Sequence, residues 1–277
     1  MAWREILGFV DGSELGLARA QVAHALARAH QAHLSLEVLV TLLQPLYGAR
    51  AETWAAFFEE DRRAARQHGT DAVRRLQAAI EGDVTVDSQE SFPETIGHVA
   101  AADARAADLV VLGRPGGLTG DGVDTTIFRT VLMQGGRPCL VLPDWTEPRP
   151  WGRRALVAWK GTPESARAVQ GALPLLKTAG SVRLWQANPR ARREGEDAES
   201  IARLATYLRR HDVPLEDPVI RDSGEPAEQL IEAELETFGA DLLVMGAYSR
   251  PRLQETLFGG MTAHIIPRAR IPVLLDH

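Results

Sequence analysis

Glycine and arginine residues follow an apolar run near the C-terminus, in a pattern suited to binding a phosphate group. The run ends at Gly246, and Arg250, Arg252 and the pair Gly259-Gly260 come after it. Glycine lets the backbone approach a ligand closely, and the amides at the start of a following helix favour an anion. We therefore predict an anion site between Gly246 and Gly260, with a bare turn as the alternative.

Three other segments could take part in the same chemistry. Lys160-Gly161-Thr162 and Asp11-Gly12-Ser13 each follow an apolar run, and a glycine-rich segment extends from Gly113 to Thr126. Lys160 could reach a phosphate or pair with a neighbouring acid. Asp11 could accept a hydrogen bond from a ligand, or serve as a turn residue or helix N-cap.

These segments occupy equivalent places in an internal repeat. The stretch WREILGFVDGSELGLARAQVAHALARA matches GRRALVAWKGTPESARAVQGALPLLKTA, which aligns Asp11 with Lys160 at an offset of 149 residues. AADLVVLGR matches GADLLVMGA at an offset of about 133, so the first copy carries about 16 additional residues near Thr41 to Ala65. We predict domains at residues 1–143 and 153–277, joined by a stiff proline-rich linker at 144–152.

Each copy alternates short apolar runs with stretches of helical periodicity. In the first copy the expected strands are 6–10, 33–40, 84–87, 109–112 and 139–142, and the expected helices are 15–29, 51–80, 94–104 and 125–134. In the second copy the strands are 155–159, 182–186, 215–220, 242–245 and 273–275, and the helices are 163–177, 196–210, 227–238 and 256–266. Strands separated by helices predict an α/β protein with two tandem, doubly wound, five-stranded parallel sheets. Ligands of such sheets bind at the carboxyl ends of the strands, near the point where the strand order reverses.

The repeated strand, DGS-like turn and helix, together with the late glycine loop and a final strand ending in PVLL, resemble the universal stress protein family in its tandem form. The resemblance implies a Rossmann-like nucleotide site. Its motif is Gly-x2-Gly-x9-Gly-[Ser/Thr] after the fourth strand, with an Asp after the first strand that meets the adenosine. In the second copy Gly246 and Gly259 match this motif. Ser249 replaces the second glycine, Gly260 stands at the hydroxyl position, and Lys160 replaces the Asp.

In the first copy Asp11, Gly113 and Gly116 match the motif, whereas Thr125 and Thr126 replace the Gly-Ser pair. The resemblance therefore places nucleotide contacts on both copies, each with departures. Lys160 is the most severe departure, because an ammonium group cannot accept a hydrogen bond from ribose or adenine.

Composition excludes several classes of protein. A net charge of -6 with dispersed arginines disfavours a nucleic-acid partner, and no apolar run approaches the roughly 20 residues of a membrane span. The opening residues MAWREILGFVDGSE contain no signal-peptide segment, so we expect a cytoplasmic protein. The single cysteine, Cys139, lies in an apolar run and is expected to be buried, and His30 with His33 is interpreted as a solvated helix end instead of a metal site.

The leading hypothesis is a universal stress protein that binds ATP or another adenine nucleotide, accompanied at most by Mg²⁺, as a sensor or regulatory module. No catalytic or metal-binding constellation is recognised, so any ATP hydrolysis should be slow. One alternative is a nucleotide-dependent hydrolase or transferase that uses Asp11, Lys160 or Arg250, and another is an interaction protein without a ligand. The resemblance implies that the two sheets pack through their final strands and that two chains form a homodimer. The long helix near Trp54, Phe57 and Phe58 is expected to pack on the core, with a partner surface as the alternative.

Overall fold

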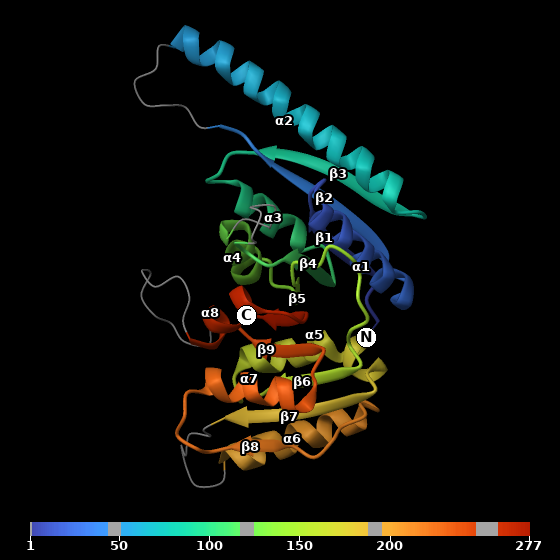
Figure 1. The fold of residues 1–277 in the computed structure, drawn as a ribbon, viewed down its shortest axis with the longest axis vertical. Helices are drawn as coiled ribbons and strands as arrows, with labels where there is room; N and C mark the ends of the chain where they lie inside the picture. Colours follow the sequence, from blue (N-terminus) through green and yellow to red (C-terminus); the bar gives the residue numbers. More distant parts are fainter. Residues whose placement is uncertain (1, 44–50, 117–124, 188–195, 248–259) are drawn as a thin grey trace. The chain divides into compact units, whose positions relative to one another are not determined.

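A computed structural model describes residues 2–43, 51–116, 125–187, 196–247 and 260–277, in which helices and strands alternate (Figure 1). The first half contains β1 (Glu5–Val10), α1 (Glu14–His30), β2 (His33–Thr41), α2 (Ala51–Ala79), β3 (Val84–Ser91), α3 (Ile96–Ala104), β4 (Leu109–Gly113), α4 (Thr125–Gln134) and β5 (Cys139–Leu142). The second half contains β6 (Arg154–Ala158), α5 (Pro163–Thr178), β7 (Ser181–Ala187), α6 (Glu196–Arg210), β8 (Val219–Arg221), α7 (Ala227–Phe238), β9 (Leu242–Gly246), α8 (Gly260–Ile265), a 3₁₀ turn (Ile266–Arg268) and β10 (Val273–Asp276). The predicted α/β class is confirmed.

Contacts between residues divide the chain into two compact units. One comprises Trp3–Arg137 with Asp144–Pro148, and the other comprises Pro138–Pro143 with Arg149–His277. The second unit therefore includes β5, which pairs antiparallel with β10, with Cys139 opposite Leu275. The expected association of the two final strands is thus present within one chain.

The strands of the first unit form a parallel sheet in the order β3-β2-β1-β4. In register, Ile6 of β1 lies opposite Leu34 on one side and Leu109 on the other. The strands of the second half follow the order β8-β7-β6-β9-β10, again with parallel neighbours. In both halves the first strand of the copy lies between the second and the fourth, as a doubly wound sheet requires.

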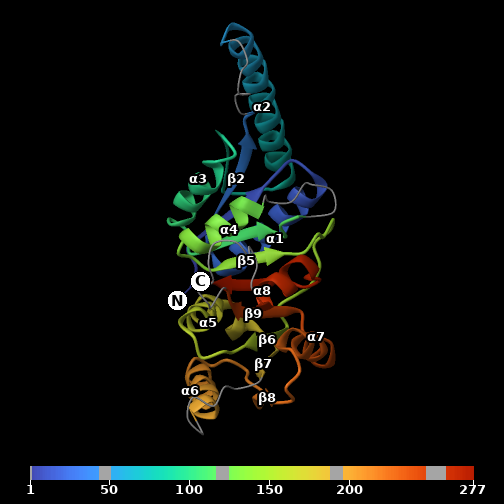
Figure 2. The ribbon, with the colours of Figure 1, turned by 90° about the vertical axis from the view of Figure 1, so that its left-hand side faces the viewer.

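Helices cover both faces of each sheet, which is why the central strands are mostly apolar. Figure 2 shows α5 and α6 on one side of the second-half strands and α7 and α8 on the other. In the first unit α3 packs with α4, and α1 packs with α2. Every residue of β4 and β5 is buried, as in parallel sheets that are covered twice. Cys139 is buried as predicted, and burial raises the pKa of its thiol.

Some predicted boundaries are wrong because pairing between strands decides where a strand ends. β3 continues to Ser91, four residues beyond the expected end, because it pairs with β2 as far as Thr41. The strand expected at 215–220 is found at Val219–Arg221, and Leu215 contributes only an isolated bridge to Val182. The helix expected at 256–266 is described from Gly260. It changes to a 3₁₀ turn at Ile266, next to Pro267, and residues 256–259 lie outside the described residues.

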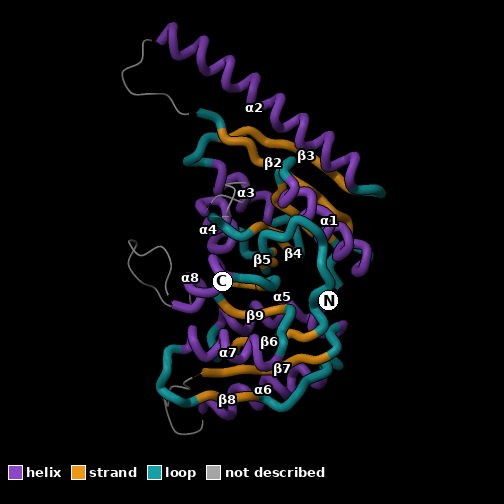
Figure 3. The backbone as a smooth tube through the Cα atoms, viewed as in Figure 1, coloured by secondary structure: helices purple, strands orange, loops and turns teal. Residues whose placement is uncertain are grey.

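The additional residues of the first copy lengthen its second helix. α2 has 29 residues, whereas the equivalent α6 has 15. Figure 3 shows α2 running alongside β3. Phe58 stacks on Phe92 with ring centroids 6.0 Å apart, but the side chain of Phe57 is 49% exposed, so the expectation of core packing is wrong for Phe57. The side chain of Trp54 lies outside the described part of the structure.

Candidate functional site

Four of the predicted site residues lie at the carboxyl ends of neighbouring parallel strands. In the first half Asp11 follows β1 and Gly113 ends β4, and β1 and β4 are hydrogen-bonded neighbours. In the second half Lys160 follows β6 and Gly246 ends the neighbouring β9. The helices that follow β6 and β9 lie on opposite faces of the sheet (Figure 2), so the chain leaves these two strands in opposite directions, which is where ligands of doubly wound sheets bind. We call this strand-end region of the second half a crevice, and likewise the equivalent region at the ends of β1 and β4.

Asp11 shapes the turn between β1 and α1. Its Oδ1 accepts a hydrogen bond from the backbone N–H of Ser13 at 2.9 Å and another from the Ser13 hydroxyl. The N-cap of α1 is Ser13, whose Oγ accepts from the N–H of Gly16, so the alternative that made Asp11 the cap is wrong. Asp11 is a turn residue whose carboxylate is already engaged by the chain.

Arg19 is a residue at this strand end that the sequence analysis did not select. It lies on the buried face of α1, its side chain is 6% exposed, and its Nη1 donates to the carbonyl oxygen of Phe9 at 3.1 Å. A Cβ built on Gly113 would lie 2.1 Å from Nη2 of Arg19, so the guanidinium rests directly on this glycine. The sequence pattern that could have identified Arg19 is its position one helical turn after Leu15, on the apolar face of the helix.

The remaining first-half residues lie around the β4 end. Gly116 adopts φ +72° with open space around its α-carbon, which favours glycine. Thr125 and Thr126 are the first two residues of α4. Arg114, which follows Gly113, forms a mostly buried ion pair with Asp144. Asp144 was assigned only to the linker in the sequence analysis.

In the second half, Lys160 is exposed immediately after β6. Gly161 adopts φ +67°, and Thr162 caps α5 in a reciprocal arrangement with Ser165. The Thr162 hydroxyl accepts from the Ser165 N–H at 3.4 Å, and the Ser165 hydroxyl accepts from the Thr162 N–H at 3.0 Å. This capping box fixes the start of α5 beside the crevice.

Gly246 allows β9 to approach the first turn of α5. A Cβ built at this position would lie 2.5 Å from the backbone nitrogen of Ser165. Gly260 begins α8 with φ +60° and is exposed. Ser249, Arg250 and Gly259 lie outside the described residues, so the loop that joins the two ends of the predicted anion site is known only from the sequence.

Gly246→Ala is expected to lower the free energy of unfolding by about 2 kcal/mol, because the added methyl group would meet backbone and not a flexible side chain. Urea unfolding of the two proteins measures this difference. Gly180→Ala is the milder comparison, since its built Cβ lies 3.3 Å from the Arg153 carbonyl oxygen. Equal stability of Gly246→Ala and the wild type would contradict the close packing described here.

An ion pair between a buried acid and an exposed arginine lies beside Gly246. Asp276 of β10 is the register partner of Gly246, and its Oδ1 lies 3.4 Å from Nε of Arg167. Burial raises the pKa of Asp276, and the attraction of Arg167 opposes this shift. Arg167 also reaches Glu164 at 3.4 Å, in the first turn of α5. Carboxylates of α5 and β10 therefore lie near Gly246, although Lys160 replaces the expected acid after β6.

The family model described as "Universal stress protein family" matches residues 2–143 and again 152–277. The chain belongs to the universal stress protein family. Relatives in the family include universal stress proteins of Mycobacterium tuberculosis and Mycobacterium bovis, each 26% identical over 243 residues that cover 81% of this chain and 79% of the relative.

Two solved structures share the fold of this universal stress protein over nearly its full length. A universal stress protein from Archaeoglobus fulgidus superimposes with a TM-score of 0.69 at 15% identity, covering 98% of this chain and 97% of the other. A functionally unknown protein from Pseudomonas aeruginosa gives a TM-score of 0.60 at 20% identity, covering 99% and 92%. The tandem Rossmann-like fold expected from the repeat is confirmed.

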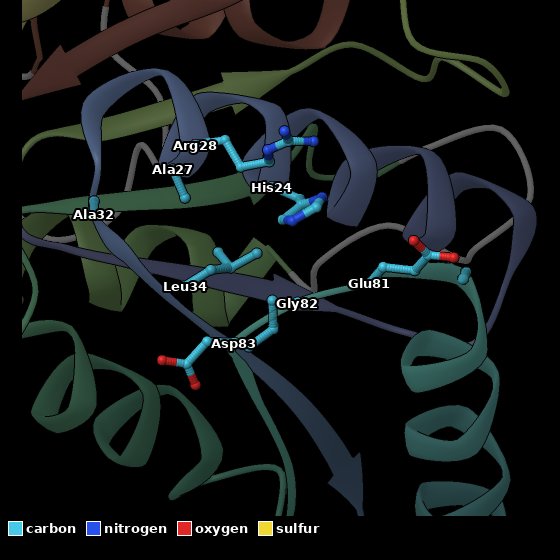
Figure 4. A pocket seen from close by; sticks show the side chains of 10 residues that line it. His24, Ala27, Arg28, Ala32, Leu34, Glu81, Gly82 and Asp83 are labelled. Carbon is cyan, nitrogen blue, oxygen red and sulfur yellow. The ribbon is translucent and has the colours of Figure 1, made fainter.

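A hollow of about 610 Å³ lies away from the strand-end sites of this universal stress protein. It is bordered by α1 and by the starts of β2 and β3, at the amino ends of the strands. Figure 4 shows His24 and Arg28 of α1 on one side and Gly82 and Asp83 on the other. Arg28, Gly82 and Asp83 are exposed, so this hollow is open to solvent, whereas ligand pockets usually enclose most of the ligand surface.

The histidines interpreted as a solvated helix end have other contacts. The His30 ring packs edge-on against Trp3 with centroids 4.7 Å apart, and burial lowers its pKa. His33 hydrogen-bonds Thr85 at 2.9 Å. Within the described ranges, no group of three or more His, Cys, Asp or Glu residues is arranged to hold a metal ion. Over the same ranges, no helix combines the length and apolar character needed to cross a bilayer.

Proposed function

We propose that this universal stress protein binds an adenine nucleotide (ATP, ADP or AMP), with Mg²⁺ accompanying the nucleotide at most, and acts as a non-catalytic sensor or regulatory module in a stress response. The observation that carries the proposal is the arrangement at the ends of β6 and β9. These strands are neighbours, an exposed lysine follows β6, a glycine ends β9, and the helices that follow lie on opposite faces of the sheet. Membership of the family supports the same placement.

Lys160 suits a phosphate group better than a nucleoside. Its ammonium group donates hydrogen bonds only, and the residue is exposed, two positions after the end of β6. A charge-assisted hydrogen bond to phosphate contributes about 1.5–3 kcal/mol, which corresponds to roughly a tenfold to hundredfold change in affinity. We therefore assign Lys160 to the phosphates and Gly246 with Gly260 to the surrounding backbone. Ser249, Arg250 and Gly259 complete the assignment from the sequence.

Lys160→Ala is expected to weaken ATP binding by about tenfold while it leaves adenosine binding unchanged. Isothermal titration calorimetry with both ligands measures the two affinities. The chain contains one other lysine, Lys177 in the last turn of α5, and Lys177→Ala is the matched control. An equal loss of ATP and adenosine binding in Lys160→Ala would contradict a phosphate contact.

The proposal as a whole is tested by thermal unfolding with ATP, ADP and AMP. A ligand that binds the folded state at 100 times its Kd adds about 2.7 kcal/mol to apparent stability, so a clear rise in Tm is expected. No rise with any of the three at millimolar concentration would exclude nucleotide binding. We further propose that the protein is cytoplasmic, forms homodimers and does not bind nucleic acid or membranes, in keeping with its net charge of -6.

A further inference from the structure

The first-half crevice contains a buried cation of the chain itself. Arg19 projects from α1, and its guanidinium reaches both strands that border the crevice. It donates to the carbonyl oxygen of Phe9 near the end of β1, and it rests on Gly113 at the end of β4. Because β1 and β4 are neighbours, the guanidinium lies between their ends, where the strand order reverses.

The charges around Arg19 are balanced by described residues. Burial lowers the pKa of Arg19, while the attraction of Asp11 and of Asp144 opposes the shift, and a guanidinium stays charged under either influence. Asp144 is also ion-paired with Arg114. Arg19 and Arg114 are thus accompanied by Asp11 and Asp144, and these four side chains together carry no net charge.

The carboxylate of Asp11 already interacts with groups of the chain itself. It accepts hydrogen bonds from the Ser13 N–H and hydroxyl, and its negative charge compensates Arg19. A nucleoside that used Asp11 as an acceptor would have to share this carboxylate with the Ser13 donors and would lie against the almost fully buried guanidinium of Arg19.

The second half differs at the equivalent helix position. The repeat offset of 149 residues places Ala168 of α5 where α1 has Arg19. Ala168 is fully buried, and Gly246 packs against the α5 backbone and not against a guanidinium. The two copies therefore share the strand-end arrangement, but among the described residues only the first copy places a buried guanidinium between the ends of its first and fourth strands.

We infer that Arg19 takes the place of a ligand in the first-half crevice, so that this half binds no nucleotide and binding is confined to the second half. The statement that nucleotide binds in the second half rests on the proposed function. The statement that Arg19 forms a charge cluster with Asp11 and Asp144 does not depend on any ligand.

Photolabelling of the full-length wild-type protein with 8-azido-ATP, followed by peptide mapping, tests where nucleotide binds. Labelled peptides are expected only from residues 153–277, and calorimetry with ATP is expected to give one site per chain. Labelled peptides that contain Asp11, Arg19 or Gly113, or two sites per chain, would overturn the inference. A protein that binds no nucleotide at all would instead overturn the proposed function.

A double-mutant cycle tests the charge cluster without nucleotide. Asp11→Asn keeps the oxygen that accepts from Ser13 and removes only the charge. It is expected to lower Tm by about 3 °C in the wild type and by less than half as much in an Arg19→Met background. Equal shifts in both backgrounds would overturn the inference. Arg19→Gln replaces Arg19→Met if the latter does not fold, and Asp83→Asn, at an exposed acid on another segment, serves as the control.

Discussion

Glu234→Ala is expected to lower the free energy of unfolding by about 3 kcal/mol. The Glu234 side chain on α7 is 3% exposed, and its two carboxylate oxygens lie 2.9 Å from Nη1 of Arg183 and 3.3 Å from Nη2 of Arg221. The Arg183 guanidinium also stacks on Phe238, 4.2 Å from the ring centroid. Removal of one member of a buried ion pair leaves the other without compensation, which costs about 3–5 kcal/mol. Arg183 retains Glu216 at 2.6 Å, so the lower end of that range applies.

Urea unfolding of the purified proteins measures the effect of Glu234→Ala. Glu232→Ala is the matched control on the same helix, since the Glu232 side chain is 47% exposed and pairs only with His264 among the described residues. An exposed pair of this kind contributes up to about 1 kcal/mol. If both variants lose the same stability, the network around Arg183 does not hold α7 against β7.

Glu37→Gln is expected to stabilise the protein relative to the wild type by an amount that grows with pH, reaching about 4 kcal/mol at pH 8. Glu37 lies on β2 with 5% exposure. Burial, followed by the charge and hydrogen bond of Asp103 and the charge of Asp87, raises its pKa from 4.5 to about 8. The folded state therefore holds this proton more tightly than the unfolded chain does. The stability that Glu37 contributes is fully present below about pH 4.5 and is lost as pH rises through 8.

A glutamine at position 37 imitates the protonated carboxyl group and can still donate to Asp103. Denaturant unfolding of both proteins at intervals from pH 5 to pH 9 measures the difference. Glu81→Gln, at an exposed residue, is the control and should show no comparable divergence. A difference between Glu37→Gln and the wild type that stays constant over this range would show that Glu37 does not titrate as described.

The tandem α/β architecture could be predicted because its signals are local and occur twice. The alternation of apolar runs with helical periodicity around Asp11 recurs around Lys160, and each half needs only its own pattern to form strands and helices. The length of β3 could not be predicted in the same way. Its last residues, including Gln89 and Glu90, are polar, and their pairing with Leu39 and Val40 of β2 makes them a strand.

The candidate sites likewise combine features that the sequence predicts with features that it does not. The places of Asp11, Gly113, Lys160 and Gly246 follow from the sequence, since any residue directly after a parallel strand comes to the carboxyl edge of the sheet. What surrounds these residues depends on contacts between segments far apart in the chain.

Arg19 is the clearest case. In the sequence it is one arginine among many, on a helix of mixed composition. Packing of α1 on the sheet brings its guanidinium to Phe9 and Gly113 and into the field of Asp144, 125 positions further along the chain. Residue order therefore determined the repeat, the fold and the location of two crevices. The tertiary structure alone decided that one crevice contains a compensated charge, because burial and charge pairing depend on distances that local sequence patterns do not encode.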